Sequence, residues 1–313
     1  MATICVRCAA SLPDAPQHRR CSACGADYPL VDGVEVLAPD HDANREDGWD
    51  PSLFEALDDL LDGHPWYGGR NRAILAFLRR YAPDVFGGRG LDLGCGNGFV
   101  TAFLAQHGVD MRGADIYLEG LRLAARRTDA RLALFAPGKL PYADEFDLVV
   151  LADVIEHVED DVALLAQAGA ALHAGGALLV TVPAFSWLWG RIDDAAHHRR
   201  RYSAGQLRHA LLKAGFSVLA VSYYMMPLVP IIFARRLVRE RSPADTFVRC
   251  STPPGPVTSA VLSLYLRLEE RLITRGLVPI GSSLLAVARA PSRVPAEPQS
   301  FRSPELAAAP RPD

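Results

Sequence analysis

The chain lacks an excess of charge of either sign. Its 313 residues contain 33 Lys and Arg against 36 Asp and Glu, which gives a formal net charge of −3. Dedicated nucleic-acid binders usually carry a basic excess, so this balance argues against that class. The first residues, from Met1 to Cys5, also lack the basic and apolar regions of a secretory signal peptide, and we therefore expect a cytoplasmic protein.

Cysteine is scarce, but four of the six cysteines are regularly spaced. Cys5 and Cys8 form one CxxC pair, and Cys21 and Cys24 form a second. In a cytosolic chain such pairs are typical of a tetrahedral zinc site, because each turn brings two thiolates to one metal. The alternative is a set of free or redox-active thiols, and His18 is a substitute ligand. We expect a structural Zn(2+) held by the four cysteines.

The hydrophobic pattern divides the chain into four parts. Residues 1–38 are expected to form a zinc ribbon, 39–63 a polar linker and a helix, 64–290 the main domain, and 291–313 a disordered tail rich in Pro and Ala. In the main domain, apolar strands alternate with helices, which predicts a Rossmann-like, doubly wound α/β sheet. A helical insertion at 224–282 precedes the last strand. The seven strands are expected near 89–93, 109–114, 130–135, 146–152, 176–182, 216–222 and 283–289.

The most informative motif is Leu91-Asp92-Leu93-Gly94-Cys95-Gly96-Asn97-Gly98, where an apolar strand runs into three glycines and then into a helix. Glycines at these positions let the backbone turn sharply and approach a ligand closely. A helix that starts there points its unpaired N–H groups into the turn. Asp115 ends the next expected strand, at the distance typical of a ribose acceptor. The alternative is a tight turn without a ligand, but together these features indicate a nucleotide-cofactor site.

This unit resembles motif I of the class I S-adenosylmethionine (SAM)-dependent methyltransferases, types 11 and 23, more closely than the dinucleotide pattern GxGxxG. The resemblance implies SAM as the cofactor and a seven-stranded class I sheet. It also implies that Asp92 takes the SAM ammonium, that Asp115 accepts the ribose hydroxyls and that Ile116 packs on adenine. The acid that the family places near adenine is replaced here by Ala136. The implied cofactor-binding residues are Arg70, Asp92, Gly94, Cys95, Gly96, Gly98, Asp115, Ile116, Ala152 and Asp153.

The segment after the second CxxC pair, with Tyr28-Pro29 and Asp32-Gly33, resembles the small zinc-ribbon activator proteins of eukaryotic and archaeal methyltransferases. Similar ribbons open the zinc-bearing bacterial rRNA guanine methyltransferases. A ribbon this small needs a metal to fold, because it cannot bury enough apolar surface. We expect it to fold as a module separate from the SAM-binding domain.

Two histidines are candidates for catalysis. His157 follows the fourth strand in Val154-Ile155-Glu156-His157-Val158, and His198 lies in the polar run after the fifth strand. Either imidazole could act as a general base. The alternative for His157 is that it only orders the start of the next helix, and the run around His198 could be a solvated basic turn. The expected acceptor-binding residues are Trp66, Tyr67, Trp187, His197, Arg200 and Tyr202.

These features predict a SAM-dependent methyltransferase that acts on a small-molecule, saccharide or lipid-linked acceptor. One alternative is an RNA methyltransferase that uses the ribbon to hold RNA, although Ala152-Asp153-Val154-Ile155 replaces the Asn-Pro-Pro-Tyr type of motif used for base-amino methylation. A second alternative is a non-catalytic SAM-binding partner protein. An RNA partner is disfavoured by the near-neutral charge.

A run without charged side chains covers residues 216–234. Its length alone would allow a membrane span, but its first part is needed for the sixth strand, and Pro227 and Pro230 interrupt a helix there. Arg235 and Arg236 follow at once, and a basic end beside an apolar segment favours anionic headgroups. We therefore expect a peripheral contact of the 224–282 insertion with the inner face of the membrane. The alternative is a helical lid packed on the sheet.

Overall fold

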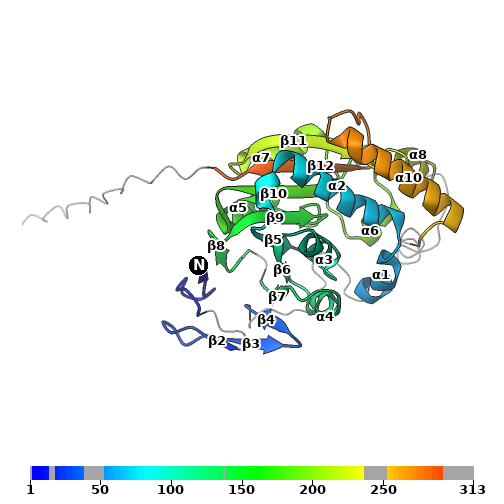
Figure 1. Ribbon diagram of the computed structural model, residues 1–313. Helices are drawn as coiled ribbons and strands as arrows, with labels where there is room; N and C mark the ends of the chain where they lie inside the picture. The colour runs from blue at the N-terminus through cyan, green and yellow to red at the C-terminus, as the bar shows by residue number, and fades with distance from the viewer. Residues whose placement is uncertain (1, 14–17, 39–52, 137, 236–251, 292–313) are drawn as a thin grey trace, which may run out of the picture.

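The computed structural model describes residues 2–13, 18–38, 53–136, 138–235 and 252–291. The linker predicted after residue 38 and the predicted tail lie almost entirely outside these ranges. The described residues form one large sheet with helices on both faces (Figure 1). The four clustered cysteines lie at one edge of this sheet, in a segment here called the cysteine module (residues 2–13 and 18–38). None of the helices in these ranges is long and apolar enough to cross a bilayer.

Seven strands form the core of the sheet, and they match the seven predicted segments to within a few residues. Four neighbouring pairs, from β10 to β7, are parallel, whereas β12 runs antiparallel to both of its neighbours. This arrangement confirms the predicted doubly wound α/β sheet. In spatial order the strands are β11 (Ser217–Tyr224), β12 (Ser283–Arg289), β10 (Leu172–Pro183), β9 (Phe146–Ala152), β5 (Arg89–Leu93), β6 (Asp110–Asp115) and β7 (Arg131–Leu134).

Helices cover both faces of this sheet. Helix α2 (Pro65–Tyr81), helix α3 (Phe99–Gln106) and helix α10 (Pro256–Ile273) pack on one face, where Phe77 and Leu266 join the central-strand residue Val150 in one apolar cluster. The other face carries α5 (Asp161–Ala171) and α7 (Ala204–Lys213). Helix α4 (Leu118–Arg127) packs beside β7, and α1 (Leu53–Leu61) packs on α4. Because the strands are parallel, the loops at their carboxyl ends meet at one edge, where ligands of such sheets bind.

The cysteine module is not separate from the sheet, in contrast to the expectation from the sequence. Strand β4 (Val34–Val36) pairs in parallel with β7, and β3 (Asp27–Val31) and β2 (His18–Arg20) continue the sheet to ten strands. A second attachment pairs β1 (Ala2–Thr3) with β8 (Tyr142–Ala143). Val34 is fully buried in one cluster with Cys95 of the glycine loop and Leu121 of α4. The module therefore packs directly behind the cofactor loop.

The insertion before the last strand is helical in its described part, as predicted. Helix α8 (Leu228–Arg235) follows β11, and α10 crosses over α2, where Leu266 leaves no room for a Cβ at Gly69. The buried carboxylate of Glu269 on α10 accepts hydrogen bonds from the backbone N–H groups of Met225 and Met226, at 2.8 and 2.9 Å. These contacts fasten α10 to the turn before α8. Short helices lie at Pro83–Val85, Ser186–Leu188 and Arg191–Ala195 (α6).

Candidate active site and cofactor cleft

The glycine loop joins β5 to α3 in a conformation that other residues would not adopt easily. Gly94, Gly96 and Gly98 have φ values of 82°, 52° and 74°, all in the left-handed region. A Cβ on Gly94 would also lie only 2.6 Å from a methyl carbon of Val154. At these three positions the loop has no side chain, so a ligand can approach its backbone closely.

Asp92 and Arg70 present an acceptor and a donor beside this loop. Asp92 is 1% exposed, and its Oδ2 accepts a hydrogen bond from the Thr101 hydroxyl at 2.7 Å. Burial raises the pKa of Asp92 to about 6. Arg70 Nη1 donates to Asp153 Oδ2 at 2.7 Å. Within the described part of the chain, neither Asp92 Oδ1 nor Arg70 Nε has a hydrogen-bond partner. This pair suits the carboxylate and ammonium of an amino acid.

Asp115 ties the loop to the neighbouring strand. Its oxygens accept the backbone N–H of Gly96 at 2.7 Å and that of Tyr117 at 3.0 Å, and the residue is 5% exposed. The Phe54 ring of α1 lies against the Tyr117 ring, with centroids 5.8 Å apart, and it also approaches Gly96. Helix α1 thus covers the end of the site where the ribose was expected. The role of Asp115 as a ribose acceptor stays a prediction.

A cavity of about 710 Å³ extends from the glycine loop to the underside of α8 and α10. It brings together many of the predicted site residues and leaves others aside. The predicted residues that line it are Trp66, Tyr67, Arg70, Asp92, Gly94, Cys95, Gly96, Ala152, Asp153, His157 and His198. Those that do not line it are Gly98, Asp115, Ile116, Trp187, His197, Arg200 and Tyr202.

Four predicted acceptor residues have other surroundings. Arg200 Nη2 donates to the backbone carbonyls of Val158 and Glu159 at 2.9 and 2.7 Å. The Tyr202 hydroxyl donates to Asp161 Oδ2 at 2.7 Å. Both side chains brace the loops around the cavity. Trp187 and His197 are exposed.

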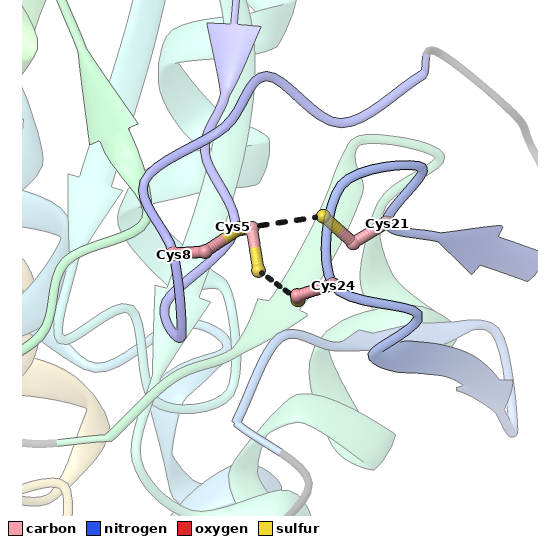
Figure 2. A group of neighbouring side chains, drawn as sticks. All are labelled: Cys5, Cys8, Cys21 and Cys24. Atoms are coloured by element: carbon pink, nitrogen blue, oxygen red, sulfur yellow. Dashed lines mark hydrogen bonds between the residues drawn. The ribbon is translucent and has the colours of Figure 1, made fainter.

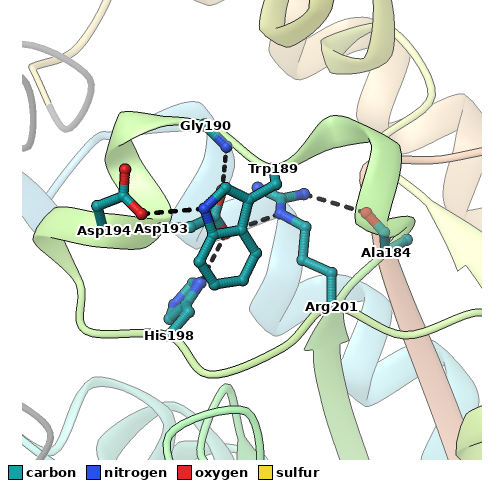
Figure 3. A network of polar contacts seen from close by, with 7 residues as sticks. All are labelled: Ala184, Trp189, Gly190, Asp193, Asp194, His198 and Arg201. Atoms are coloured by element: carbon teal, nitrogen blue, oxygen red, sulfur yellow. Dashed lines mark hydrogen bonds and ion pairs between the residues drawn. The ribbon is translucent and has the colours of Figure 1, made fainter.

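A buried polar network fixes His198 (Figure 3). Asp193 is fully buried, and its Oδ1 accepts hydrogen bonds from Arg201 Nε at 2.7 Å and from His198 Nδ1 at 2.8 Å. Its Oδ2 accepts the Gly190 N–H at 2.8 Å. Burial opposes ionisation of Asp193, but the His198 hydrogen bond and the Arg201 charge hold its pKa below the usual value. An ionised Asp193 keeps the proton of His198 on Nδ1, which leaves the lone pair on Nε2.

Several residues outside the predicted set of site residues also lie here. Glu156, Trp189, Asp194 and Arg201 line the cavity, and Asp193 lies directly behind it. Trp189 Nε1 donates to Asp194 Oδ1 at 2.9 Å. The available signal was the concentration of acids between two tryptophans and two histidines in one loop.

The four cysteines of the CxxC pairs lie close together in the cysteine module (Figure 2). Cys5 Sγ lies 3.5 Å from Cys24 Sγ, and Cys8 Sγ lies 3.5 Å from Cys21 Sγ. All four sulfurs lie within 4.8 Å of one another. Four thiols from two CxxC turns match the donor set of a tetrahedral structural zinc site. The cluster is consistent with the predicted zinc ribbon.

Comparisons with known proteins agree with this architecture. Residues 67–221 match a family model described as a methyltransferase domain. Curated relatives include ubiquinone biosynthesis O-methyltransferases from Idiomarina loihiensis, 28% identical over 138 residues, and Bordetella avium, 26% identical over 136 residues. Each alignment covers 41% of this chain, and 56% and 52% of the respective relative. The chain thus spans about half the length of these relatives.

Solved structures share the fold. A Haemonchus contortus phosphoethanolamine N-methyltransferase 2 in complex with SAM superimposes with a TM-score of 0.53 at 21% identity, covering 80% of this chain and 60% of that one. A Haloferax volcanii complex between the Trm112 methyltransferase activator and a methyltransferase gives 0.52 at 20% identity, covering 77% and 96%. The match over residues 67–221 shows that the chain contains a methyltransferase domain, and its sheet shares the class I fold of the SAM-bound methyltransferase structure.

Proposed function

We propose that the protein binds SAM at the glycine loop and transfers its methyl group to an acceptor in the adjoining cavity. The proposal rests on two polar atoms that line the cavity with Gly94, Asp92 Oδ1 and Arg70 Nε, which have no hydrogen-bond partner among the described residues. SAM ends in an amino acid, so its ammonium would meet Asp92 and its carboxylate would meet Arg70. A dinucleotide would instead bring a pyrophosphate, which a buried carboxylate would repel.

SAM, when bound, supplies a methyl group on a positively charged sulfur. The chain would position that group. Ala152 and Asp153 end β9 at the cavity wall, and the rings of Trp66 and Tyr67 lie beside Arg70, with centroids 5.3 and 5.7 Å from its guanidinium carbon. Aromatic faces and carboxylates both favour a cation. The main catalytic contribution is then the alignment of the acceptor with the methyl group.

The acceptor half of the cavity favours a mainly apolar molecule with a polar reacting end. Its outer wall is formed by apolar side chains of α8 and α10, whereas its inner wall carries Trp189, Asp194 and His198. We infer a small or lipid-linked acceptor that reacts through oxygen, as the names of the O-methyltransferase relatives suggest. A wholly polar saccharide would leave the apolar wall without a partner.

We also propose that the acceptor reaches the cavity from an anionic bilayer. On α10, Val257, Val261, Leu264 and Leu268 are 76%, 65%, 71% and 54% exposed, and their spacing places them on one helix face. The exposed Arg267 and Arg271 lie towards the end of the same face. Apolar residues beside arginines match a peripheral contact with anionic lipid.

The cysteine module would hold one structural zinc through Cys5, Cys8, Cys21 and Cys24. The small size of the module and its clustered thiols support this assignment. Because β4 belongs to the same sheet as β5, the zinc would also stabilise the edge behind the cofactor loop.

Calorimetry with two ligands tests the cofactor proposal. SAM and 5′-methylthioadenosine share the nucleoside, but only SAM has the amino-acid end. Arg70→Gln is expected to weaken SAM at least tenfold and to leave 5′-methylthioadenosine unchanged. Arg72→Gln, on the same helix but paired with Glu270, is the matched control. Equal losses for both ligands in Arg70→Gln would refute the assignment.

The acceptor class is tested by transfer of a labelled methyl group from SAM to cell extracts separated into lipid, saccharide and RNA fractions. We expect label in the lipid fraction. Label in RNA alone would favour the RNA methyltransferase alternative. SAM binding without any transfer would favour a non-catalytic partner protein.

A further inference from the structure

Glu156, His157 and His198 form a compact cluster on the cavity wall. Each offers a donor atom within 4.8 Å of the other two. Glu156 and His157 lie in the turn after β9, and His198 lies after α6. We propose that these three side chains bind a first-row divalent metal ion next to the position of methyl transfer. The inference rests on the proposed function for its role in catalysis, but not for the binding itself.

Glu156 provides an independent reason to expect a ligand. Its side chain is fully buried, yet neither carboxylate oxygen has a hydrogen-bond partner among the residues that the structure describes. A buried carboxylate without partners is costly and is normally paired, protonated or bound to a metal. Burial and the charge of Asp153 raise the pKa of Glu156 well above its usual value. A cation at this point would satisfy both oxygens and favour the ionised carboxylate.

His198 is oriented as metal-binding histidines are. Its Nδ1 lies 2.8 Å from Asp193 Oδ1, so Nε2 is left to bind. Metal-bound histidines almost always donate their other N–H to a carboxylate or a carbonyl, which fixes the ring and raises its basicity. Arg201 Nε donates to the same oxygen at 2.7 Å and balances the charge of Asp193. The network in Figure 3 therefore has the form of an outer coordination shell.

The two ligand-bearing segments are also fastened to each other. The Arg199 N–H donates to the Glu156 carbonyl at 2.8 Å, and Arg199 Nε donates to the His157 carbonyl at 3.0 Å. Because Arg199 directly follows His198, these bonds hold the three donors in one place. The ring centroids of His157 and His198 are 4.8 Å apart. A site held in this way loses little entropy when the ion binds.

The donor set selects the kind of metal. Two imidazoles and one carboxylate suit Mn(2+), Fe(2+), Co(2+) or Zn(2+), whereas Ca(2+) and Mg(2+) prefer oxygen ligands. Three protein ligands leave coordination positions open towards the cavity. An acceptor hydroxyl bound there would lose its proton to solvent at a lower pH. Its oxygen would then form the new C–O bond as the C–S bond breaks, with the electron pair left on sulfur.

Manganese binding to the full-length, zinc-loaded protein tests the proposal. Mn(2+) competes poorly for thiolates, so the cysteine module does not interfere. The loss of the free Mn(2+) signal in electron paramagnetic resonance reports the affinity. We expect one Mn(2+) per chain, with at least tenfold weaker binding in Glu156→Gln and in His198→Asn. Asp193→Asn should weaken binding by roughly 10–100-fold, as outer-shell changes do.

His197→Asn is the matched control, because His197 is exposed and lies outside the cavity. It should bind Mn(2+) like the parent. Circular dichroism and SAM calorimetry identify any variant that fails to fold. A parent protein that binds SAM but no Mn(2+) would overturn this inference alone, as would equal Mn(2+) binding in all folded variants. A protein that binds Mn(2+) but not SAM would overturn the proposed function and leave the metal site standing.

Discussion

Asp92→Asn separates the binding role of this carboxylate from its effect on the fold. The asparagine oxygen can still accept the Thr101 hydroxyl, so the local packing is retained. The change removes the negative charge that would face the SAM ammonium. A hydrogen bond to a charged group is worth about 1.5–3 kcal/mol, so SAM affinity should fall roughly 10–150-fold.

The stability of the protein without SAM should change in the opposite direction. Burial raises the pKa of Asp92 from 3.8 to about 6, so the fold favours the protonated form. The stabilisation from this preference is complete below pH 3.8 and is lost as the pH rises through 6. A shift of this size corresponds to about 3 kcal/mol that the ionised group costs at pH 7. Asp92→Asn should therefore unfold at an equal or higher denaturant concentration than the parent at pH 7.

The pH dependence of SAM binding follows from the same pKa. Ammonium binding requires ionised Asp92, so parent affinity should rise with pH up to about 6 and level off above it. In Asp92→Asn this rise should disappear. Calorimetry between pH 5 and 8 measures both quantities, and Asp110→Asn, an exposed carboxylate at the start of β6, serves as the control. A variant that binds SAM as tightly as the parent at pH 7.5 would refute the assignment of Asp92.

Three further changes test the loop, the zinc and the membrane surface. Gly94→Ala should abolish measurable SAM binding in calorimetry and lower the free energy of unfolding by about 1–3 kcal/mol. The positive φ of Gly94 is unfavourable for alanine, and the added Cβ would clash with the Val154 side chain. Cys21→Ser should lose zinc in metal analysis and also weaken SAM several-fold, since β4 packs behind the glycine loop; unchanged SAM affinity would show that the module is energetically separate. Leu264→Ser with Leu268→Ser should reduce flotation with anionic liposomes at least tenfold, whereas Leu212→Ser, 55% exposed on α7, should not. Flotation that resists both changes would exclude α10 as the contact.

The parallel core could be predicted from sequence because its strands are buried on both faces. Phe146–Ala152 lies at its expected position because a mainly apolar run between turn signals is typical of a buried parallel strand. Arg89–Leu93 lies at its expected position directly before the glycine motif. The docking of β4 could not be predicted in this way. Its pairing with β7 depends on a register between two short strands that lie far apart in the chain, and no local pattern encodes it.

The loop between β10 and α7 shows a similar limit at the level of single residues. His197 and His198 are neighbours with the same chemistry, yet only His198 lines the cavity. The choice depends on the left-handed backbone at His197, with φ of 54°, and on the buried Asp193 that holds the next ring. Neither feature can be read from residue types alone. The motif at Gly94 can be recognised from residue types, because the cofactor loop requires the positive φ values that glycine adopts easily.

The pairing of β4 with β7 has a consequence for the order of events during synthesis. Val34 pairs with Leu132, so the amino-terminal module leaves the ribosome long before its partner strand exists. At roughly 5–20 residues per second, about a hundred intervening residues correspond to an interval of roughly 5–20 seconds. During that interval the exposed edge of β4 could pair with other chains. Early capture of a metal by the four thiols would hold the hairpin folded until β7 arrives, so zinc supply would set the yield of correctly assembled protein.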